Sequence, residues 1–376
     1  MAKLGEVCTI VSGSTPKTSV TSYWDGNIKW ITPAELNEDT FYIMDSVRHI
    51  TEEGKEKTGL SYLPTGTVIL SSRAPIGKTA IAGCKMCCNQ GFKNLICSDA
   101  IYNEYLYFFL KSKTDYLNSL GRGATFKEIS KSIVESIEIP LPEVNQQKEI
   151  AEKFKKLEQL ISLRKQQLAK LDELVKARFV EMFETRKYPI EKLGRVCEKI
   201  TDGTHKTPTY LDSGIKFISA KNIIDGKVDL TDTKYISKNE YQEIQKRCQV
   251  EIQDILLTKS GTLGIPAIIR TDCALGLFES LAVIKYDRSK LLPYFLYEQL
   301  RCNRVQRQFK AGTKGVAVKH LHLGVISDID IIVPPISYQL EFSDFAEQVD
   351  KQKQTVQQSL DKLELMKKAL MQEYFG

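Results

Sequence analysis

Long apolar runs are missing from this sequence of 376 residues, and their absence limits what the chain can be. No stretch approaches the roughly 18 consecutive apolar residues that a membrane-spanning helix needs, and the first residues lack the pattern of a secretory signal. We therefore expect a cytoplasmic protein with no membrane partner. No low-complexity linker interrupts the chain either, and its length is enough for two cores of ordinary size.

A complete set of metal ligands is also lacking. Cys84, Cys87, Cys88 and Cys97 lie close together in the sequence, but neither a second CxxC pair nor a nearby histidine completes a zinc site. Nine cysteines without an extracellular context are expected to be reduced thiols. The net charge of +6 is modest, and the basic excess lies in residues 185–335, which carry 24 basic and 17 acidic residues. This excess favours a polyanionic partner for that part of the chain.

Catalytic signatures are equally scarce. An amino-methyltransferase needs a glycine-rich cofactor loop and an Asn/Asp/Ser-Pro-Pro-aromatic loop, of which residues 333–336 (VPPI) have only the prolines. A nuclease needs carboxylates clustered around a metal, and Asp328 and Asp330 have no third partner nearby. Residues 72–79 (SRAPIGKT) nearly match a phosphate-binding loop but have Ser72 where glycine is required, which leaves a nucleotide site as a minor alternative. We predict a non-catalytic chain with no cofactor and no metal.

The sequence does contain two long helical runs, from about Val144 to Phe183 and from about Ile336 to Phe375. Apolar residues recur in alternating steps of four and three, which is the heptad spacing of a coiled coil. Lys353 and Ala346 also fall at positions of this seam. The residues expected to form the helix-pairing seam are Ile150, Phe154, Leu157, Ile161, Leu168, Leu171, Val175, Phe342, Val349, Val356, Leu360, Leu363 and Leu370.

The sequence before each helical run is also repeated, so that one design occupies nearly the whole chain twice. KLGEVC (3–8) returns as KLGRVC (192–197), TGTVILSSRAPIG (65–77) as QDILLTKSGTLG (253–264), and FKEISKSIVESIEI (126–139) as VKHLHLGVISDIDI (318–331). Each half is expected to mix short strands with one or two helices. We predict buried strands at residues 68–70, 137–141, 255–257 and 329–333, and helices at 102–111 and 292–301.

This layout resembles the specificity subunits of type I restriction–modification systems. The resemblance covers the full length and is carried by the two KLG openings, by IPLPEVNQQKEIAEKF and VPPISYQLEFSDFAEQV at the heads of the helices, and by GATFKEIS (123–130) and GVAVKHLHL (315–323). It implies an α/β fold in which two pseudo-repeated target-recognition domains, 1–142 and 185–335, are separated by two long spacer helices, 143–184 and 336–376. It also implies that these helices pair as an antiparallel coiled coil. Helical runs of about 40 residues would span roughly 60 Å.

The same resemblance implies partners and a division of labour. The chain would read a bipartite site in double-stranded DNA and dock two modification (methyltransferase) subunits on its helices. Those subunits would bind S-adenosylmethionine, and a separate restriction (motor–nuclease) subunit would cleave. Leu160, Leu174, Phe179, Leu365 and Met371 lie off the seam and are the predicted docking surface. Two alternatives stay open: a non-catalytic coiled-coil scaffold with two protein-binding heads, and an autonomous methyltransferase.

Residues that could contact DNA are basic or amide side chains beside Ser or Thr in turns, because such groups reach base edges and phosphates. Recurrence in both halves favours the pairs Lys127/Lys319 and Arg73/Lys259 as phosphate contacts, whereas Asn89, Gln90, Lys221 and Asn222 are better candidates for reading bases. Trp30 and Phe217 occupy matching positions and are expected in the core. The predicted DNA-binding residues are Lys17, Lys29, Ser72, Arg73, Lys78, Asn89, Gln90, Arg122, Thr125, Lys127, His205, Lys206, Lys221, Asn222, Lys259, Ser260, Lys310, Thr313, Lys314 and Lys319.

Overall fold

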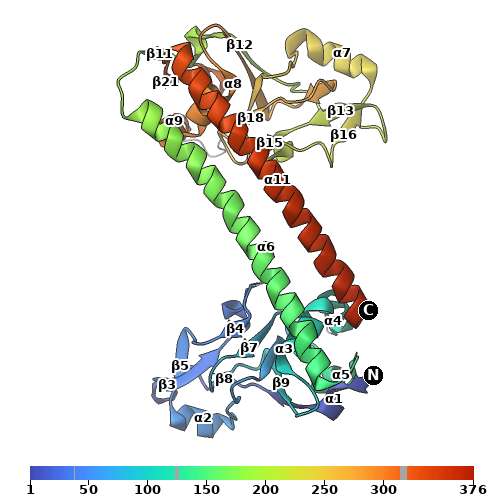
Figure 1. The fold of residues 1–376 in the computed structure, drawn as a ribbon. Coiled ribbons are helices and arrows are strands. Elements are labelled where there is room, and N and C mark those ends of the chain that lie inside the picture. The colour runs from blue at the N-terminus through green and yellow to red at the C-terminus, as the bar shows by residue number, and fades with distance from the viewer. Residues whose placement is uncertain (38, 123–126, 314–319) are drawn as a thin grey trace. The chain divides into compact units, whose positions relative to one another are not determined.

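The computed structural model describes residues 1–37, 39–122, 127–313 and 320–376, and it consists of two compact units. Unit 1 comprises Met1–Lys165 and Gln358–Gly376, and unit 2 comprises Gln166–Gln357. Each unit contains one globular part together with a segment of both long helices, α6 (Val144–Phe179) and α11 (Ile336–Phe375) (Figure 1). The chain therefore enters unit 1 twice, at its beginning and at its end.

Unit 1 is built on two mixed sheets. The larger sheet has the strand order β2 (Cys8–Ser12), β9 (Phe92–Cys97), β6 (Val68–Ser71), β7 (Thr79–Ala82) and β4 (Tyr42–Ile43), and the smaller has the order β5 (Arg48–Ile50), β3 (Trp24–Ile31) and β8 (Cys87–Cys88). A short ladder joins β1 (Ala2–Lys3) to β10 (Glu138–Ile139). The helices are α1 (Leu4–Val7), α2 (Glu52–Thr58), α3 (Asn103–Ser112), α4 (Thr114–Leu120) and α5 (Lys131–Ser136), with 3₁₀ turns η1 (Thr21–Tyr23) and η2 (Pro33–Glu35).

Unit 2 repeats this plan with one strand fewer in its main sheet. That sheet has the order β12 (Cys197–Asp202), β20 (Leu281–Tyr286), β17 (Ile255–Thr258) and β18 (Pro266–Ile268), and the smaller has the order β16 (Lys234–Ile236), β13 (Ile215–Ile218) and β19 (Leu275–Leu277). Two further ladders join β11 (Ile190–Lys192) to β21 (Asp330–Ile332) and β14 (Ile223–Ile224) to β15 (Lys227–Val228). The helices are α7 (Lys238–Arg247), α8 (Pro293–Arg301), α9 (Asn303–Gly312) and α10 (Leu323–Ser327), with 3₁₀ turns η4 (Leu193–Arg195) and η5 (Ala220–Asn222).

The predicted elements are present, with small shifts at their ends. Strands β6, β10, β17 and β21 and helices α3 and α8 form where the apolar patterns indicated, and Trp30 and Phe217 are buried as expected. Helix α6 ends at Phe179 and continues as one π-helical stretch, η3 (Val180–Glu184). The turn after β6 leads into strand β7 and not into a helix, so the phosphate-binding-loop alternative for residues 72–79 is wrong.

The two long helices pair antiparallel within each unit. In unit 1 the Nζ of Lys153 lies 3.1 Å from the hydroxyl of Tyr374, and the Nζ of Lys367 lies 2.8 Å from a carboxylate oxygen of Glu158. In unit 2, Arg178 pairs with Glu341 at 2.7 Å, and Lys353 pairs with Asp172. In both units the residue numbers rise along α6 as they fall along α11, which confirms the predicted antiparallel pairing.

The residues of the predicted seam lie buried or half-buried along α6 and α11. Leu168, Leu171, Leu363 and Leu370 are half-buried, and the nine other seam residues are buried. Lys353, an unexpected residue at a seam position, is accommodated because its ammonium reaches Asp172 on α6. Phe179 lies off the seam but is buried in the core of unit 2, so its assignment to the exposed docking surface was wrong.

The helix ends are parts of the two hydrophobic cores. In unit 1 the ring of Phe154 from α6 stacks on Phe108 of α3 and on Phe375 of α11, with centroid distances of 5.1 and 5.6 Å. In unit 2 the ring of Phe342 from α11 lies 5.5 Å from Phe179 and 5.6 Å from Phe183. Each globular part is therefore fixed to its helix pair by buried aromatic contacts, which stabilise the junction beyond their buried area.

A buried glutamine fixes the start of each long helix in the same way. The side-chain amide of Gln147 accepts a hydrogen bond from the backbone N–H of Tyr102 at 2.8 Å and donates to the carbonyls of Ala100 and Pro142 at 3.0 and 2.8 Å. Gln339 repeats all three bonds in unit 2, with the N–H of Leu292 and the carbonyls of Lys290 and Pro334. Both glutamines are fully buried, so each satisfies three backbone groups that water cannot reach.

Candidate nucleic-acid interface

Equivalent backbone hydrogen bonds define which residues of the two units correspond. The backbone N–H of Ser72 donates to Gly91 at 2.7 Å and its carbonyl accepts from Ile129 at 2.9 Å. In unit 2, Lys259 makes the same two bonds, to Ser280 at 2.8 Å and from Leu321 at 2.8 Å. Lys259 is therefore the counterpart of Ser72, and the predicted equivalence of Lys259 with Arg73 was wrong by one residue.

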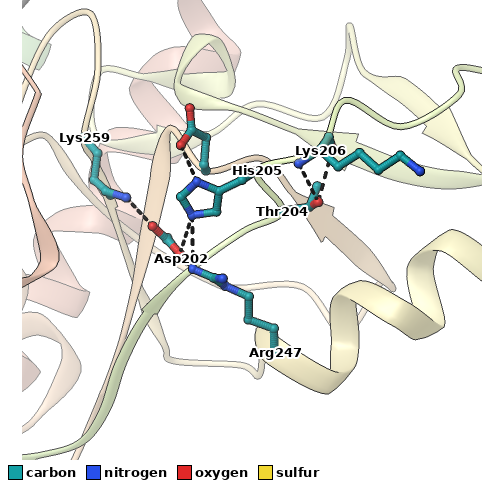
Figure 2. A network of polar contacts seen from close by, with 7 residues as sticks. Asp202, Thr204, His205, Lys206, Arg247 and Lys259 are labelled. Carbon is teal, nitrogen blue, oxygen red and sulfur yellow. Dashed lines mark hydrogen bonds and ion pairs between the residues drawn. The ribbon is translucent and has the colours of Figure 1, made fainter.

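A charged cluster lies at the end of β12 in unit 2 (Figure 2). The carboxylate of Asp202 is only 3% exposed, and its two oxygens have different partners. Oδ2 pairs with the ammonium of Lys259, which is 2% exposed, and Oδ1 lies 2.5 Å from Nη2 of Arg247. Arg247 is the last residue of α7, and its side chain is 53% exposed. One carboxylate thus joins a buried cation to an exposed one.

His205 adds a second layer to this cluster. Its Nδ1 lies 2.8 Å from a carboxylate oxygen of Glu279, and its Nε2 lies 3.1 Å from Nη2 of Arg247 and 3.3 Å from Oδ1 of Asp202. A neutral imidazole that donates from Nδ1 to Glu279 can accept a hydrogen bond from Arg247 at Nε2. The guanidinium is therefore held by both the carboxylate and the ring.

The electrostatics of the cluster favour the ionised carboxylate. Burial alone would raise the pKa of Asp202, but hydrogen bonds and charge from Lys259 and Arg247 outweigh it and hold the pKa below its usual value. Burial, reinforced by the positive charge of Lys259, lowers the pKa of the neighbouring His320. The site therefore keeps its negative charge at Asp202 near neutral pH, while His320 tends toward its neutral form.

Unit 1 has a comparable cluster at the start of β9. Glu128 places one oxygen 3.1 Å from the ammonium of Lys93, which is 8% exposed, and the other 2.9 Å from Nε of Arg73, which is 45% exposed. Burial tends to raise the pKa of Glu128, but hydrogen bonds and charge from Lys93 and Arg73 leave it lowered. Arg122 lies beside the cluster, because its backbone exchanges two hydrogen bonds with Glu128 at 3.0 and 3.1 Å.

The two clusters share a geometry that they build from different positions. Each has one carboxylate whose two oxygens are divided between a buried lysine and an exposed arginine. Ser12 of β2 pairs with Lys93 of β9, and Asp202 of β12 pairs with Ala282 of β20, at matching places in the two sheets. The buried lysine and the carboxylate therefore occupy positions that do not correspond in the two units, and the exposed guanidinium is present in both.

The other predicted DNA-binding residues fall into several groups. Lys29, Lys78, Asn89 and Asn222 use their side chains within the fold; the ammonium of Lys78, for example, donates to the carbonyls of Pro33 and Leu36. Ser72 and Thr313 are buried like Lys259, and Ser260 is half-buried. Burial of these side chains weakens their assignment to DNA, because a contact would require them to move. The exposed candidates are Lys17, Gln90, Arg122, Lys127, Lys206, Lys221 and Lys310, and Thr125, Lys314 and Lys319 lie outside the described residues.

Five members of the clusters were not among the predicted residues. Lys93 is a charge directly after the buried Phe92 in a strand, a signal that could have singled it out, whereas Asp202 lies between Thr201 and Gly203 at the end of β12. Glu128 precedes the serine that caps α5, and Glu279 lies in the turn before β20. Arg247 has no sequence signal, because it is the last residue of an ordinary amphipathic helix.

Comparison with known proteins identifies the family. A profile of the type I restriction modification DNA specificity domain matches residues 1–173 and, a second time, residues 187–365. The chain belongs to the type I restriction–modification specificity subunits. This membership confirms the predicted resemblance and the non-catalytic role in recognition, and the double match agrees with the internal repeat.

Related specificity subunits are found in archaea and bacteria. The MjaIX specificity subunit of Methanocaldococcus jannaschii is 30% identical over 360 residues, which cover 89% of this chain and 82% of that protein. The EcoBI specificity subunit of Escherichia coli is 26% identical and covers 66% of this chain and 59% of that protein.

Solved structures support the fold. A type I S subunit from M. genitalium matches with a TM-score of 0.60 at 15% identity, covering 100% of this chain and 95% of that one. A chain from a structural study of type I complex assembly matches with a TM-score of 0.62 at 17% identity, with coverage of 100% and 96%. This likeness confirms the predicted architecture of two α/β domains and paired helices. Among the described helices, none combines the length and apolar character needed to span a bilayer.

Proposed function

We propose that this specificity subunit reads a bipartite site in double-stranded DNA, with residues 1–142 recognising one half and residues 185–335 the other. It would present the DNA to two modification subunits docked on the helices, and a restriction subunit would join the full complex. The observation that carries the proposal is the duplicated frame with different side chains at equivalent places. Ser72 corresponds to Lys259 and Glu128 to His320 within the same backbone hydrogen-bond pattern. Two similar frames that hold different side chains at equivalent places suit two different half-sites.

The decisive experiment is co-expression with the methyltransferase encoded beside this gene, followed by mapping of methylated adenines. We expect a split motif. Exchange of residues 185–335 for the corresponding domain of another specificity subunit should change one half of the motif and leave the other half intact. A stable complex without sequence-dependent methylation would contradict the proposal and leave a scaffold as the better description.

Docking of modification subunits has a candidate surface in unit 1. Leu160 and Leu163 of α6 and Leu365 and Met366 of α11 are exposed, Leu365 at 69%. The pairs Glu158–Lys367 and Lys165–Glu364 place these side chains at the same level of the helix pair. Exposed apolar side chains that gather on a helical surface are typical of a protein-binding site.

Substitution of Leu160 and Leu163 by glutamate should abolish co-purification with the methyltransferase, because charges would replace the apolar contacts. The thermal stability of the subunit should change little, since both side chains are already exposed. Gln159→Glu is the matched control, because it adds one charge to the same helix at an exposed polar position. Undiminished co-purification of the double leucine variant would place the docking surface elsewhere.

The scaffold alternative is tested by the salt dependence of DNA binding. A complex that neutralises six to ten phosphates should lose at least about 1,000-fold in affinity between 50 and 200 mM salt, because binding releases condensed counterions. A scaffold with protein-binding heads would show no such slope. The measurement is fluorescence anisotropy of a labelled duplex containing the mapped motif, titrated with the purified complex.

A further inference from the structure

We propose that Arg73 and Arg247 are the specificity-determining residues of the two domains, and that each reads the guanine of one G·C pair in its half-site. Lys93 with Glu128, and Lys259 with Asp202, are the positioning residues that hold these guanidinium groups. The inference rests on the proposed function, and it names the residues and the base by which each half-site is recognised.

The first argument is orientation. An exposed arginine normally samples many rotamers, and binding DNA costs the free energy of fixing one of them. Arg73 is tied at Nε to Glu128, and Arg247 is tied at Nη2 to Asp202 and His205. The tie of Arg73 at Nε leaves both of its Nη groups for a ligand. Arg247 makes both ties with Nη2, so it presents a two-nitrogen edge when Nη2 exchanges its bond to His205 for one to the base. A planar donor fork held in this way matches the O6 and N7 acceptors of guanine in the major groove.

The second argument is the function of the buried lysine. A buried carboxylate with a single exposed partner would be costly, because its other oxygen would lack a compensating charge. Lys259 neutralises that oxygen of the buried Asp202 from inside the fold (Figure 2). In unit 1 the ammonium of Lys93, 8% exposed, pairs with the second oxygen of Glu128, which is 33% exposed. The carboxylate can therefore remain ionised and hold the arginine before DNA arrives.

The third argument is that the same charge arrangement recurs at positions that do not correspond in the repeat. Arg73 lies in the turn after β6, whereas Arg247 ends α7, so the two arginines do not occupy equivalent positions of the repeat. The same division of a carboxylate between a buried lysine and an exposed arginine is nevertheless present in both units. A merely structural ion pair has no need of an exposed arginine in each case, and a recognition head does.

The test uses the whole complex, with this chain co-expressed with its methyltransferase, and maps methylated adenines for each variant. Arg73→Ala should relax one G·C position in the half-site of residues 1–142, so that discrimination at that position falls about 10- to 100-fold. Arg247→Ala should do the same only in the other half-site. Each variant is the control for the other, because its second half-site must remain unchanged.

Conservative variants separate base reading from phosphate contact. Arg73→Lys and Arg247→Lys keep the charge but lose the fork, so discrimination should still fall if a base is read. A motif that is unchanged in every variant, with methylation lowered uniformly, would overturn the inference in favour of phosphate contacts. Glu128→Gln should weaken discrimination at the position that Arg73 reads while leaving the other half-site intact, an effect that loss of folding cannot imitate.

The motif methylated by the wild-type complex tests the arginine assignment separately from bipartite recognition. A split motif in which either half lacks a G·C pair would overturn the assignment of the arginines and leave bipartite recognition standing. The absence of any split motif from the wild-type complex would refute the proposed function, and the arginine assignment with it.

Discussion

Replacement of Asp202 by alanine should lower the free energy of unfolding of unit 2 by about 3–5 kcal/mol, because it leaves the ammonium of Lys259 buried without its partner. Two units can unfold separately, so the measurement is hydrogen exchange of the amides of β12 and β17 in the full chain. Lys246→Ala is the matched control. That lysine pairs with Glu243 on the surface of α7, and its loss should change stability by less than about 1 kcal/mol.

The effect of Asp202→Ala should also depend on pH. The pKa of Asp202 is lowered in the folded state, so the carboxylate binds protons more weakly there than in the unfolded chain. Its contribution is therefore fully present above the unfolded value of about 3.9 and is lost as the pH falls through the folded pKa. We expect the same stability difference from wild type at pH 7 and pH 5.5, and a smaller one below about pH 4. A difference that grows on acidification would contradict the assigned ion pair.

Replacement of Gln147 by alanine should cost unit 1 about 3 kcal/mol, because it leaves a buried N–H and two buried carbonyls without partners. Faster hydrogen exchange should appear first at Tyr102 and along α3, where the lost bond joined the helix to α6. Gln146→Ala is the control, because the neighbouring side chain is exposed and its loss should be close to neutral. Equal effects of the two substitutions would mean that Gln147 does not fix the junction. Gln339→Ala should reproduce the result in unit 2.

The frame of the protein could be predicted from sequence because its signals are periodic and repeated. Apolar residues at alternating intervals of four and three predicted the helix pair. The duplicated KLG openings and the proline-flanked strands predicted the two globular parts. Phe179 was assigned to the docking surface because the heptad pattern describes only the contact between two helices. The pattern does not indicate that the end of α6 packs into the globular core of unit 2.

The candidate site was less accessible to sequence reasoning. Lysine is normally exposed, so the burial of Lys259 depends on a carboxylate 57 positions earlier in the chain. Arg247 enters the cluster only because α7 ends beside β12, and no local pattern encodes that neighbourhood. The one-residue error in aligning Arg73 with Lys259 arose because the two basic residues were matched by charge. The turns Ser71–Gly77 and Thr258–Gly264 are closed by the same backbone hydrogen bonds, which align Ser72 with Lys259.

The aromatic contacts of Phe375 have a consequence for the order in which the chain folds during synthesis. Phe375 lies against Tyr105, Phe109 and Phe154, so the core of unit 1 is completed by a ring that the ribosome adds more than 200 residues later. Unit 2 is one continuous segment and contains all its own core residues. The unit translated second can therefore fold to completion first, while the unit translated first waits with an exposed aromatic surface. Released chains that end at residue 357 should show protease protection in residues 185–335 that exceeds the protection in residues 1–142.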